Sequence, residues 1–215
     1  MCAMGIKMVE QKNRKESKPF QGARKLFHVL ASSFIPLVYW FLPYFTTQQE
    51  TRIYLIVLLS CSLLFSFSFD LARLLSPRIN AFLMERFSLL IRQTEAHRFT
   101  GATFLCLSFL MTILFFSREI AVAAMLFLSL GDTVAEIAGK KWGRRKFRGR
   151  SLEGMAGFFL TSLPVAWLIL GDWRVAVMGA AAGALIEFFS FSIDDNLSVP
   201  FLSALCLWFI LHCLF

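Results

Sequence analysis

The chain has 215 residues, of which 57% are hydrophobic and 17% are charged, and its mean hydropathy is +0.65. A soluble domain normally carries about a quarter charged residues and a smaller apolar share, so this composition excludes a single soluble domain. The net charge of +8 does not call for a nucleic-acid partner, because basic residues flanking membrane spans account for it. We therefore expect an all-α, polytopic membrane bundle that binds no nucleic acid.

The first 24 residues are basic and polar and contain no apolar run of their own. We therefore do not expect a cleavable signal peptide here. We interpret residues 1–24 as a short, flexible cytoplasmic arm whose Lys and Arg side chains can contact anionic lipid headgroups. Residues 25–215 are then expected to form one transmembrane domain.

Apolar runs long enough to cross a bilayer follow one another along the rest of the chain. Between the second and third runs, residues of about 76–98 have one apolar face, which predicts an amphipathic helix lying on the membrane surface. Pro77 suits the first turn of that helix. The seven predicted spans are Leu26–Phe45, Ile53–Leu71, Thr100–Phe116, Ile120–Gly139, Met155–Leu170, Val175–Phe191 and Leu197–Phe215.

Basic residues lie almost entirely on one side of these spans. Of the 22 Lys and Arg, all but Arg52, Arg118 and Arg174 fall in the N-terminal arm, the segment after the second span or the loop at 140–150. The positive-inside rule then predicts a cytoplasmic N-terminus and an external C-terminus. In a bacterium, the host membrane would be the cytoplasmic membrane, with the candidate site on its inner face.

The fourth predicted span carries two acids near its cytoplasmic end. Asp132 and Glu136 are four residues apart, so they share a helix face. Gly131 and Gly139 flank them, which leaves room for a close ligand or for a break in the helix. A carboxylate inside a membrane is costly unless it is paired, metal-bound or reached by water, so it usually marks function.

A basic loop follows this span and leads into the next helix. Carboxylates can hold Mg²⁺, which prefers hard oxygen ligands and substrate phosphates, and a helix N-terminus offers free N–H groups to an anion. This combination predicts a polyphosphate site, although the basic run taken alone is also typical of a positive-inside loop. The residues assigned to the nucleotide are Lys140, Lys141, Arg144, Arg145, Lys146, Arg150, Ser151 and Gly154.

A second polar cluster, Asp194-Asp195-Asn196, stands at the cytoplasmic end of the sixth predicted span. Two carboxylates and an amide suit metal coordination, but the same residues are also good turn and N-cap formers. Glu187 lies two turns earlier, inside the span, and this favours a functional site.

Two more clusters are predicted at the same membrane face. Arg24, Lys25 and His28 stand at the mouth of the first span, where interfacial anchoring is the simpler alternative. Glu95 and Arg98 lie just before the third span, where Glu95 can orient Arg98. Because clusters far apart in sequence fall on one face, we expect a single site, in which these residues, with Glu136 and Glu187, have supporting roles.

In order and spacing, these residues resemble the polyprenol kinase family, which includes dolichol kinases, phytol kinases and CTP-dependent diacylglycerol kinases. The resemblance implies transfer of a nucleotide γ-phosphate, usually from CTP, to a lipid hydroxyl. Relatives often have Lys where this chain has Arg150, which keeps the charge but changes its geometry. The matching segments are Arg24-Lys25-x-x-His28, Glu95-x-x-Arg98-x-x-Gly101, Gly131-Asp132-Thr133, Ser151-Leu152-Glu153-Gly154 and Asp194-Asp195-Asn196-Leu197.

The sequence therefore favours a Mg²⁺-dependent lipid-alcohol kinase that uses CTP and acts on a polyprenol, a phytol-like alcohol or diacylglycerol. Asp132 and Asp195 would hold the metal, assisted by Asp194 or Asn196. Glu153, or one of the Asp pair, would receive the hydroxyl proton. Phosphoryl transfer needs mainly alignment and charge neutralisation, which these groups can supply.

Three matters stay open. A phosphatidate cytidylyltransferase, which transfers CMP to a lipid phosphate, shares an Asp-containing helix, a basic loop and a Glu-Gly pair with this family. A small ion-coupled transporter is disfavoured, because the outer halves of the predicted spans lack ionisable residues. The oligomeric state is not predicted, and a homodimer is one alternative.

Overall fold

The computed structural model describes residues 18–86, 95–144, 146–147, 149–190 and 194–213. This part of the chain is helical apart from one short hairpin. The elements are α2 (Lys18–Phe41), η1 (Leu42–Tyr44), α3 (Gln48–Leu75), α4 (Pro77–Arg86), α5 (Gly101–Phe115), α6 (Arg118–Leu126), η3 (Phe127–Asp132), α7 (Thr133–Lys141), β1 (Lys146–Phe147), β2 (Arg150–Ser151), α8 (Leu152–Leu170), α9 (Trp173–Phe189) and α10 (Asp195–Cys213).

Each predicted span coincides with one helical rod, and α6, η3 and α7 together form a single continuous rod. Four rods in the described part are long and apolar enough to cross a membrane: α3, the rod Arg118–Lys141, α8 and α10. Shorter apolar helices occupy Val29–Tyr44 and Gly101–Phe115. The all-helical membrane class is therefore supported, whereas seven spans and the orientation of the termini stay predictions.

The rod Arg118–Lys141 forms the centre of the bundle. Its apolar window is 67% buried inside the protein, against 17% for the window in α3. Residues from Ile120 to Leu128 are almost completely buried against α2, α8 and α10. On this central rod Asp132 is half-buried and Glu136, nearer the end, is exposed, whereas most of α3 is left to face its surroundings.

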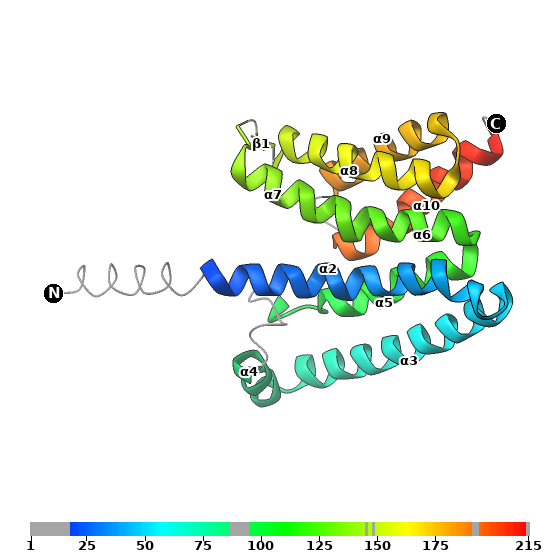
Figure 1. Cartoon of the computed structure of the whole chain (residues 1–215). Coiled ribbons are helices and arrows are strands. Elements are labelled where there is room, and N and C mark those ends of the chain that lie inside the picture. The colour runs from blue at the N-terminus through cyan, green and yellow to red at the C-terminus, as the bar shows by residue number, and fades with distance from the viewer. Residues whose placement is uncertain (1–17, 87–94, 145, 148, 191–193, 214–215) are drawn as a thin grey trace.

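The segments predicted to share one membrane side gather at one end of the bundle. Figure 1 shows the β1–β2 hairpin, α4 and the beginnings of α2 and α5 at its left-hand end, and η1 and the α8–α9 connection at the other. Polar groups on separate elements can meet at the hairpin end, which carries the candidate site.

The predicted surface helix and N-terminal arm both need correction. A helix begins at Pro77 as expected, but Glu95–Arg98 form a turn, so α-helix does not reach residue 98. In this turn the carbonyls of Glu95 and Arg98 accept hydrogen bonds from the Arg73 side chain. In the arm, residues 1–17 lie outside the described part, and the chain is helical rather than a flexible arm from Lys18 onward.

Candidate active site

A π-helical turn places Asp132 at the centre of the site. The turn, η3, covers Phe127–Asp132 inside a rod that continues without a break to Lys141. π-turns within α-helices are rare and often occur at functional sites. Gly131 leaves room for α8 rather than for a ligand, because an added Cβ would lie 2.8 Å from Ser162 Oγ. The predicted helix break is therefore wrong, and the glycine serves close packing.

Arg150 connects three elements that are far apart in the sequence. It lies on β2, whose partner β1 pairs Phe147 with Arg150. Its Nη2 donates to both carboxylate oxygens of Asp195, each at 2.6 Å, and its Nη1 donates to Glu187. The hairpin, the end of α9 and the first turn of α10 are thereby held together by one guanidinium.

Arg150 lies among more carboxyl groups than its single positive charge can neutralise. Burial alone lowers the pKa of the Arg150 guanidinium, but the Asp195 and Glu187 carboxylates more than offset this effect and raise it. Asp132 also lies close enough to interact electrostatically with Arg150, Asp195 and Glu187. One guanidinium carries a single positive charge beside three carboxyl groups, so a further cation would stabilise their ionised forms.

Asp194 directly precedes α10 and caps its first turn. Its Oδ1 accepts a hydrogen bond from the Asn196 N–H at 3.0 Å, and its carbonyl accepts from the N–H groups of Leu197 and Ser198. These contacts satisfy amides that a helix N-terminus leaves without partners. The N-cap alternative is therefore confirmed for Asp194.

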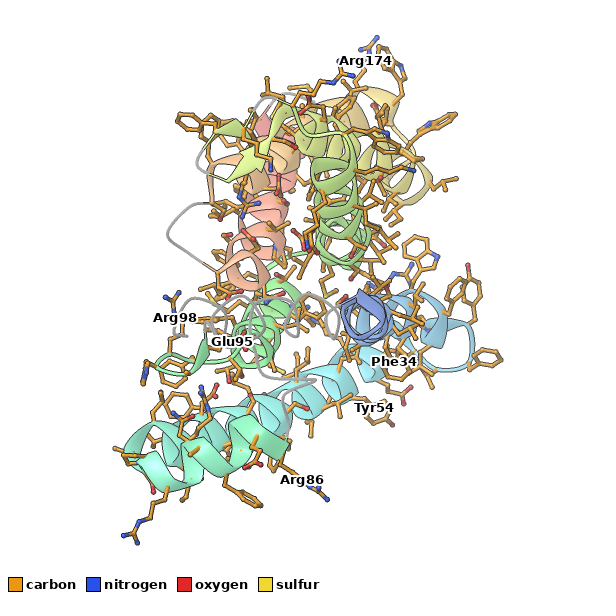
Figure 2. All side chains as sticks on the ribbon, turned by 90° about the vertical axis from the view of Figure 1, so that its left-hand side faces the viewer. Phe34, Tyr54, Arg86, Glu95, Arg98 and Arg174 are labelled. Carbon is orange, nitrogen blue, oxygen red and sulfur yellow. The ribbon has the colours of Figure 1, made fainter. Side chains whose placement is uncertain are left out.

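Asn196 brings the segment before α5 into the site. Its carbonyl accepts a hydrogen bond from Ser108 Oγ at 2.5 Å. A Cβ on Gly101 would lie 2.6 Å from Asn196 Nδ2, so only glycine allows this close approach. Glu95 Oε1 accepts the Gly101 N–H at 3.0 Å, and the Arg98 side chain is exposed beside it (Figure 2). The Glu95 and Asn196 clusters therefore meet, as the sequence predicted.

The predicted nucleotide-binding loop is largely exposed. Lys140 forms an ion pair with Glu136 one turn earlier, and Lys141 lies 4.8 Å from the centre of the Trp142 ring. Arg144 and Lys146 are exposed, whereas the predicted Arg145 lies outside the described residues. Because these cations are exposed, they can meet a soluble anion at little desolvation cost.

The Ser-Leu-Glu-Gly segment builds the junction between this loop and α8. Ser151 Oγ accepts the Gly154 N–H at 3.0 Å and so caps the helix. Glu153 Oε1 accepts the Arg144 N–H at 3.1 Å, which holds the loop in place. Gly154 packs against α7, because a Cβ there would lie 2.8 Å from the Ala135 carbonyl oxygen. These three residues therefore have local structural contacts in addition to any contact with a nucleotide.

Three of the four predicted clusters are thus connected by described contacts. The fourth falls on α2, and the side chains of Arg24, Lys25 and His28 lie outside the described residues. Of the predicted metal ligands, Asp195 contacts Arg150 directly, and Asp132 interacts electrostatically with both of them.

This chain is similar to CTP-dependent diacylglycerol kinases. It is 26% identical to CTP-dependent diacylglycerol kinase 1 of Saccharomyces cerevisiae over 168 residues, and 29% identical to that of Schizosaccharomyces pombe over 142 residues. These alignments cover 65% and 57% of the chain, and 58% and 65% of the two kinases, so the chain spans less than two thirds of either.

A further relative, which aligns over a longer part of the chain, has no stated activity. The chain is 29% identical over 196 residues to an uncharacterized protein of Rickettsia prowazekii, covering 86% of this chain and 92% of that protein. No protein-family model and no solved structure matches the chain. The named relatives support the lipid kinase family, and the apolar helices support an integral membrane protein.

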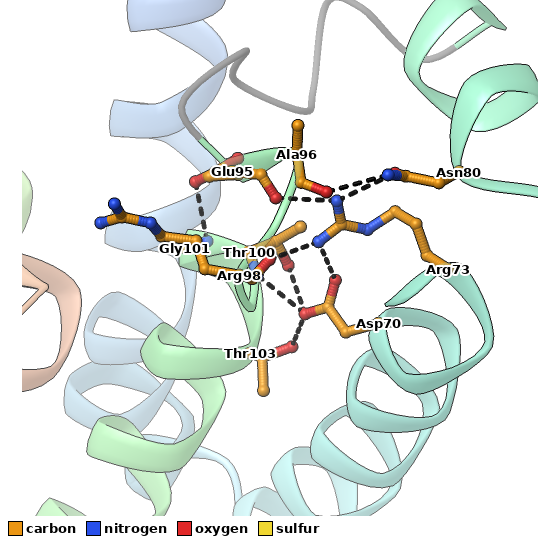
Figure 3. Close-up of polar contacts among 9 residues, drawn as sticks. All are labelled: Asp70, Arg73, Asn80, Glu95, Ala96, Arg98, Thr100, Gly101 and Thr103. Atoms are coloured by element: carbon orange, nitrogen blue, oxygen red, sulfur yellow. Dashed lines mark hydrogen bonds and ion pairs between the residues drawn. The ribbon is translucent and has the colours of Figure 1, made fainter. Parts of the chain in front are cut away.

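Sequence reasoning missed a buried ion pair near the site. Asp70 and Arg73 are both completely buried at the end of α3, and Arg73 Nη2 donates to Asp70 Oδ1 at 3.1 Å. Asp70 Oδ2 also accepts from the Thr100 N–H and hydroxyl and from the Thr103 hydroxyl, at 2.7–2.9 Å (Figure 3). The sequence does contain a signal for this ion pair, because the acid and the base are three residues apart at the end of an apolar run.

Arg73 extends this network to the segment that carries Glu95 and Arg98. Its two terminal nitrogens donate to the Glu95 carbonyl at 2.8 Å and to the Arg98 carbonyl at 2.5 Å. Asn80 on α4 adds a bond to the Ala96 carbonyl at 2.9 Å. The backbone beside the site is therefore anchored to α3 and α4 by buried hydrogen bonds.

Proposed function

We propose that this chain is a membrane lipid kinase that transfers the γ-phosphate of CTP to the hydroxyl of a lipid alcohol. The observation that carries the proposal is the contact of Arg150 with Asp195 and Glu187, close to Asp132. It joins the acidic, basic and helix-start motifs at one end of an apolar bundle. The named relatives make diacylglycerol the first candidate acceptor, with polyprenols and phytol-like alcohols as the others.

The donor set suits Mg²⁺ bound together with the nucleotide. Mg²⁺ is usually held by one or two carboxylates plus substrate phosphates rather than by a cage made only of protein. Among the described residues, no group of three or more His, Cys, Asp and Glu side chains is arranged to hold a metal ion. Asp132 and Asp195 supply the two carboxylates, and the bound ion would neutralise charge that develops on the phosphates.

The remaining residues align the two substrates. The exposed cations Lys140, Lys141, Arg144 and Lys146 bind the triphosphate oxygens, and Arg150 exchanges one carboxylate partner for a phosphate oxygen. The lipid oxygen then forms a bond to the γ-phosphorus while the bond from that phosphorus to the β-phosphate oxygen breaks, releasing CDP. The hydroxyl proton passes to a carboxylate of the site, either Glu153 or one of the pair Asp194 and Asp195.

We also propose an orientation for the helical bundle in the membrane. All seven rods would cross the bilayer, and the hairpin end would face the cytoplasm, where CTP is soluble. The basic loop would then lie at the headgroup level, where a lipid hydroxyl resides. Cysteine labelling at Arg144→Cys and Arg174→Cys, which lie near opposite ends, tests this orientation in sealed vesicles.

The reaction is tested with the purified protein and two labelled forms of CTP. Diacylglycerol, a polyprenol and phytol are each incubated with α-labelled or γ-labelled CTP, and with γ-labelled ATP. A kinase places the γ label in the lipid and leaves the α label in solution. Transfer of the α label to phosphatidate would instead establish a cytidylyltransferase, and transfer of neither label would overturn the proposal.

A further inference from the structure

An apolar groove runs along the outside of the bundle between α3 and α5. Its volume is about 630 Å³. Leu63, Leu64 and Phe67 line it from α3, and Phe104, Leu107 and Leu110 line it from α5. On each helix these positions are spaced by three or four residues, so each set forms one continuous face.

The groove opens toward the surroundings of the bundle. The Leu64 side chain is 68% exposed and Phe67 is 44% exposed, on a helix that buries little of its apolar window inside the protein. In a membrane, such a surface meets hydrocarbon rather than water. The polar side chains in the groove are those of Ser60 and Thr103, and the Thr103 hydroxyl already donates to Asp70.

One end of the groove lies next to the candidate active site. Phe99 closes this end by stacking on Phe67, with ring centres 5.4 Å apart. Thr100 follows and is fixed by Asp70, and Gly101 then contacts Asn196 and Glu95. A chain lying in the groove would therefore have one end within a helical turn of residues that belong to the site.

We infer that the α3–α5 groove holds a hydrocarbon chain of the lipid substrate, with the lipid headgroup at the Phe99 end. The inference rests on the proposed function and adds where the acceptor lies. Pockets for small ligands typically measure about 300–1,000 Å³, so this groove suits one acyl or isoprenoid chain. The Asp70–Thr103 hydrogen bond fixes the distance between its two walls at the headgroup end.

The groove is tested by filling it and comparing lipids of different chain length. Leu64→Trp places a large ring in the groove, and Leu58→Trp makes the same change on an exposed part of α3 outside it. We expect Leu64→Trp to raise the KM for dioleoylglycerol about tenfold, since small misfits in an apolar pocket have effects of this size. The KM for CTP should change little, the KM for dioctanoylglycerol should rise less because its shorter chains fill less of the groove, and Leu58→Trp should match the wild type.

A second measurement does not depend on catalysis. A diacylglycerol with a photoactivatable acyl chain is crosslinked to the wild-type protein and mapped by mass spectrometry. Crosslinks to the α3 segment around Leu63–Phe67, lost in Leu64→Trp, are the expected result. Crosslinks elsewhere, or equal KM values for both variants, would overturn the inference, as would a change of oligomeric mass in Leu64→Trp without a change in lipid dependence.

Different results would contradict the kinase activity and the lipid-binding groove. Wild-type protein that phosphorylates no lipid alcohol contradicts the kinase, whereas the crosslinking result still decides the groove. An active wild-type enzyme whose groove variants behave normally contradicts the groove and leaves the kinase in place.

Discussion

Two arginines in this protein each pair with carboxylates, yet their surroundings differ. Arg73 and its partner Asp70 are fully buried, and Arg73 also donates to backbone carbonyls at the segment beside the site. The Arg150 side chain is 20% exposed and its partner Asp195 30% exposed. Arg150 bonds mainly to side chains that are themselves candidate catalytic groups.

This difference indicates that Arg73 has a structural role, whereas Arg150 can change its hydrogen-bond partners. A buried guanidinium bonded to backbone carbonyls cannot leave them without exposing unpaired polar groups to an apolar interior, which is costly. A partly exposed guanidinium between two carboxylates can exchange one of them for phosphate at a smaller cost. We therefore expect changes near Arg150 to affect mainly the reaction, and changes near Arg73 to affect mainly stability.

The largest effect is expected from Asp132→Asn. The substitution keeps the shape of the side chain but removes the charge that supports Mg²⁺ and the phosphates. We expect kcat for γ-label transfer to fall about a thousandfold, a loss typical of a key charge-stabilising group. Glu119→Gln is the matched control, because this acid lies at the other end of the same rod and pairs with Arg118. Near-normal activity of Asp132→Asn would contradict the assignment.

Arg150 is expected to tolerate lysine better than alanine. Arg150→Ala leaves Asp195 and Glu187 without their cation and should lower kcat about a hundredfold. Arg150→Lys keeps the charge and should stay within about tenfold of wild type, with a higher KM for CTP because a forked contact becomes a single one. Steady-state kinetics distinguish these outcomes, and Arg86→Ala, an exposed charge on α4, controls for general electrostatics. Equal losses in both Arg150 variants would contradict a role of charge alone.

Asp70→Asn should affect stability more than chemistry. It leaves the buried Arg73 without its counter-charge, and breaking such a pair costs about 3–5 kcal/mol. We expect a clear fall in the thermal unfolding midpoint in detergent, with a smaller loss of kcat per folded molecule. If the unfolding midpoint stays unchanged while activity is lost, Asp70 belongs with the reactive groups and the contrast between the two arginines fails.

The smallest effect is expected at the far end of the bundle. Thr47 caps α3 through a reciprocal pair of bonds with Glu50. Thr47→Ala should destabilise the protein by about 1 kcal/mol and leave both KM values unchanged, because η1 and the start of α3 lie away from the hairpin end (Figure 1). Gln49→Ala, in the same turn without a capping contact, should match the wild type. Loss of activity in Thr47→Ala would show that the two ends are coupled.

Much of the fold was predictable because apolar runs report helices directly. The helices matched their predicted spans, and Pro77 marked the start of α4 as expected. The turn at Glu95–Arg98 was not predictable, because the carbonyls of Glu95 and Arg98 accept hydrogen bonds from the distant Arg73 side chain. Such tertiary contacts leave no periodic signal in the sequence.

The candidate site was predictable in its members but not in its pairings. Asp132 and Glu187 were identified because acids are costly in apolar surroundings, and Asp195 was identified because it lies in a cluster that suits metal coordination. That Arg150 contacts two of them was not predictable, since the partners lie 37 and 45 residues away. Asp70 satisfied the same criterion and was nevertheless overlooked, because it stands at the boundary of a span, where charges are common.

The π-helical turn has a consequence for how the site tolerates change in length. An α-helix turns by about 100° per residue, so adding or removing one residue in Phe127–Asp132 rotates everything after it relative to everything before it. The buried α6 face would stay against α2 and α10 while Asp132 and α7 turned away from Arg150. The direction in which the Asp132 carboxylate points therefore depends on the number of residues in this turn. We expect a single-residue deletion here to abolish activity while the bundle stays folded.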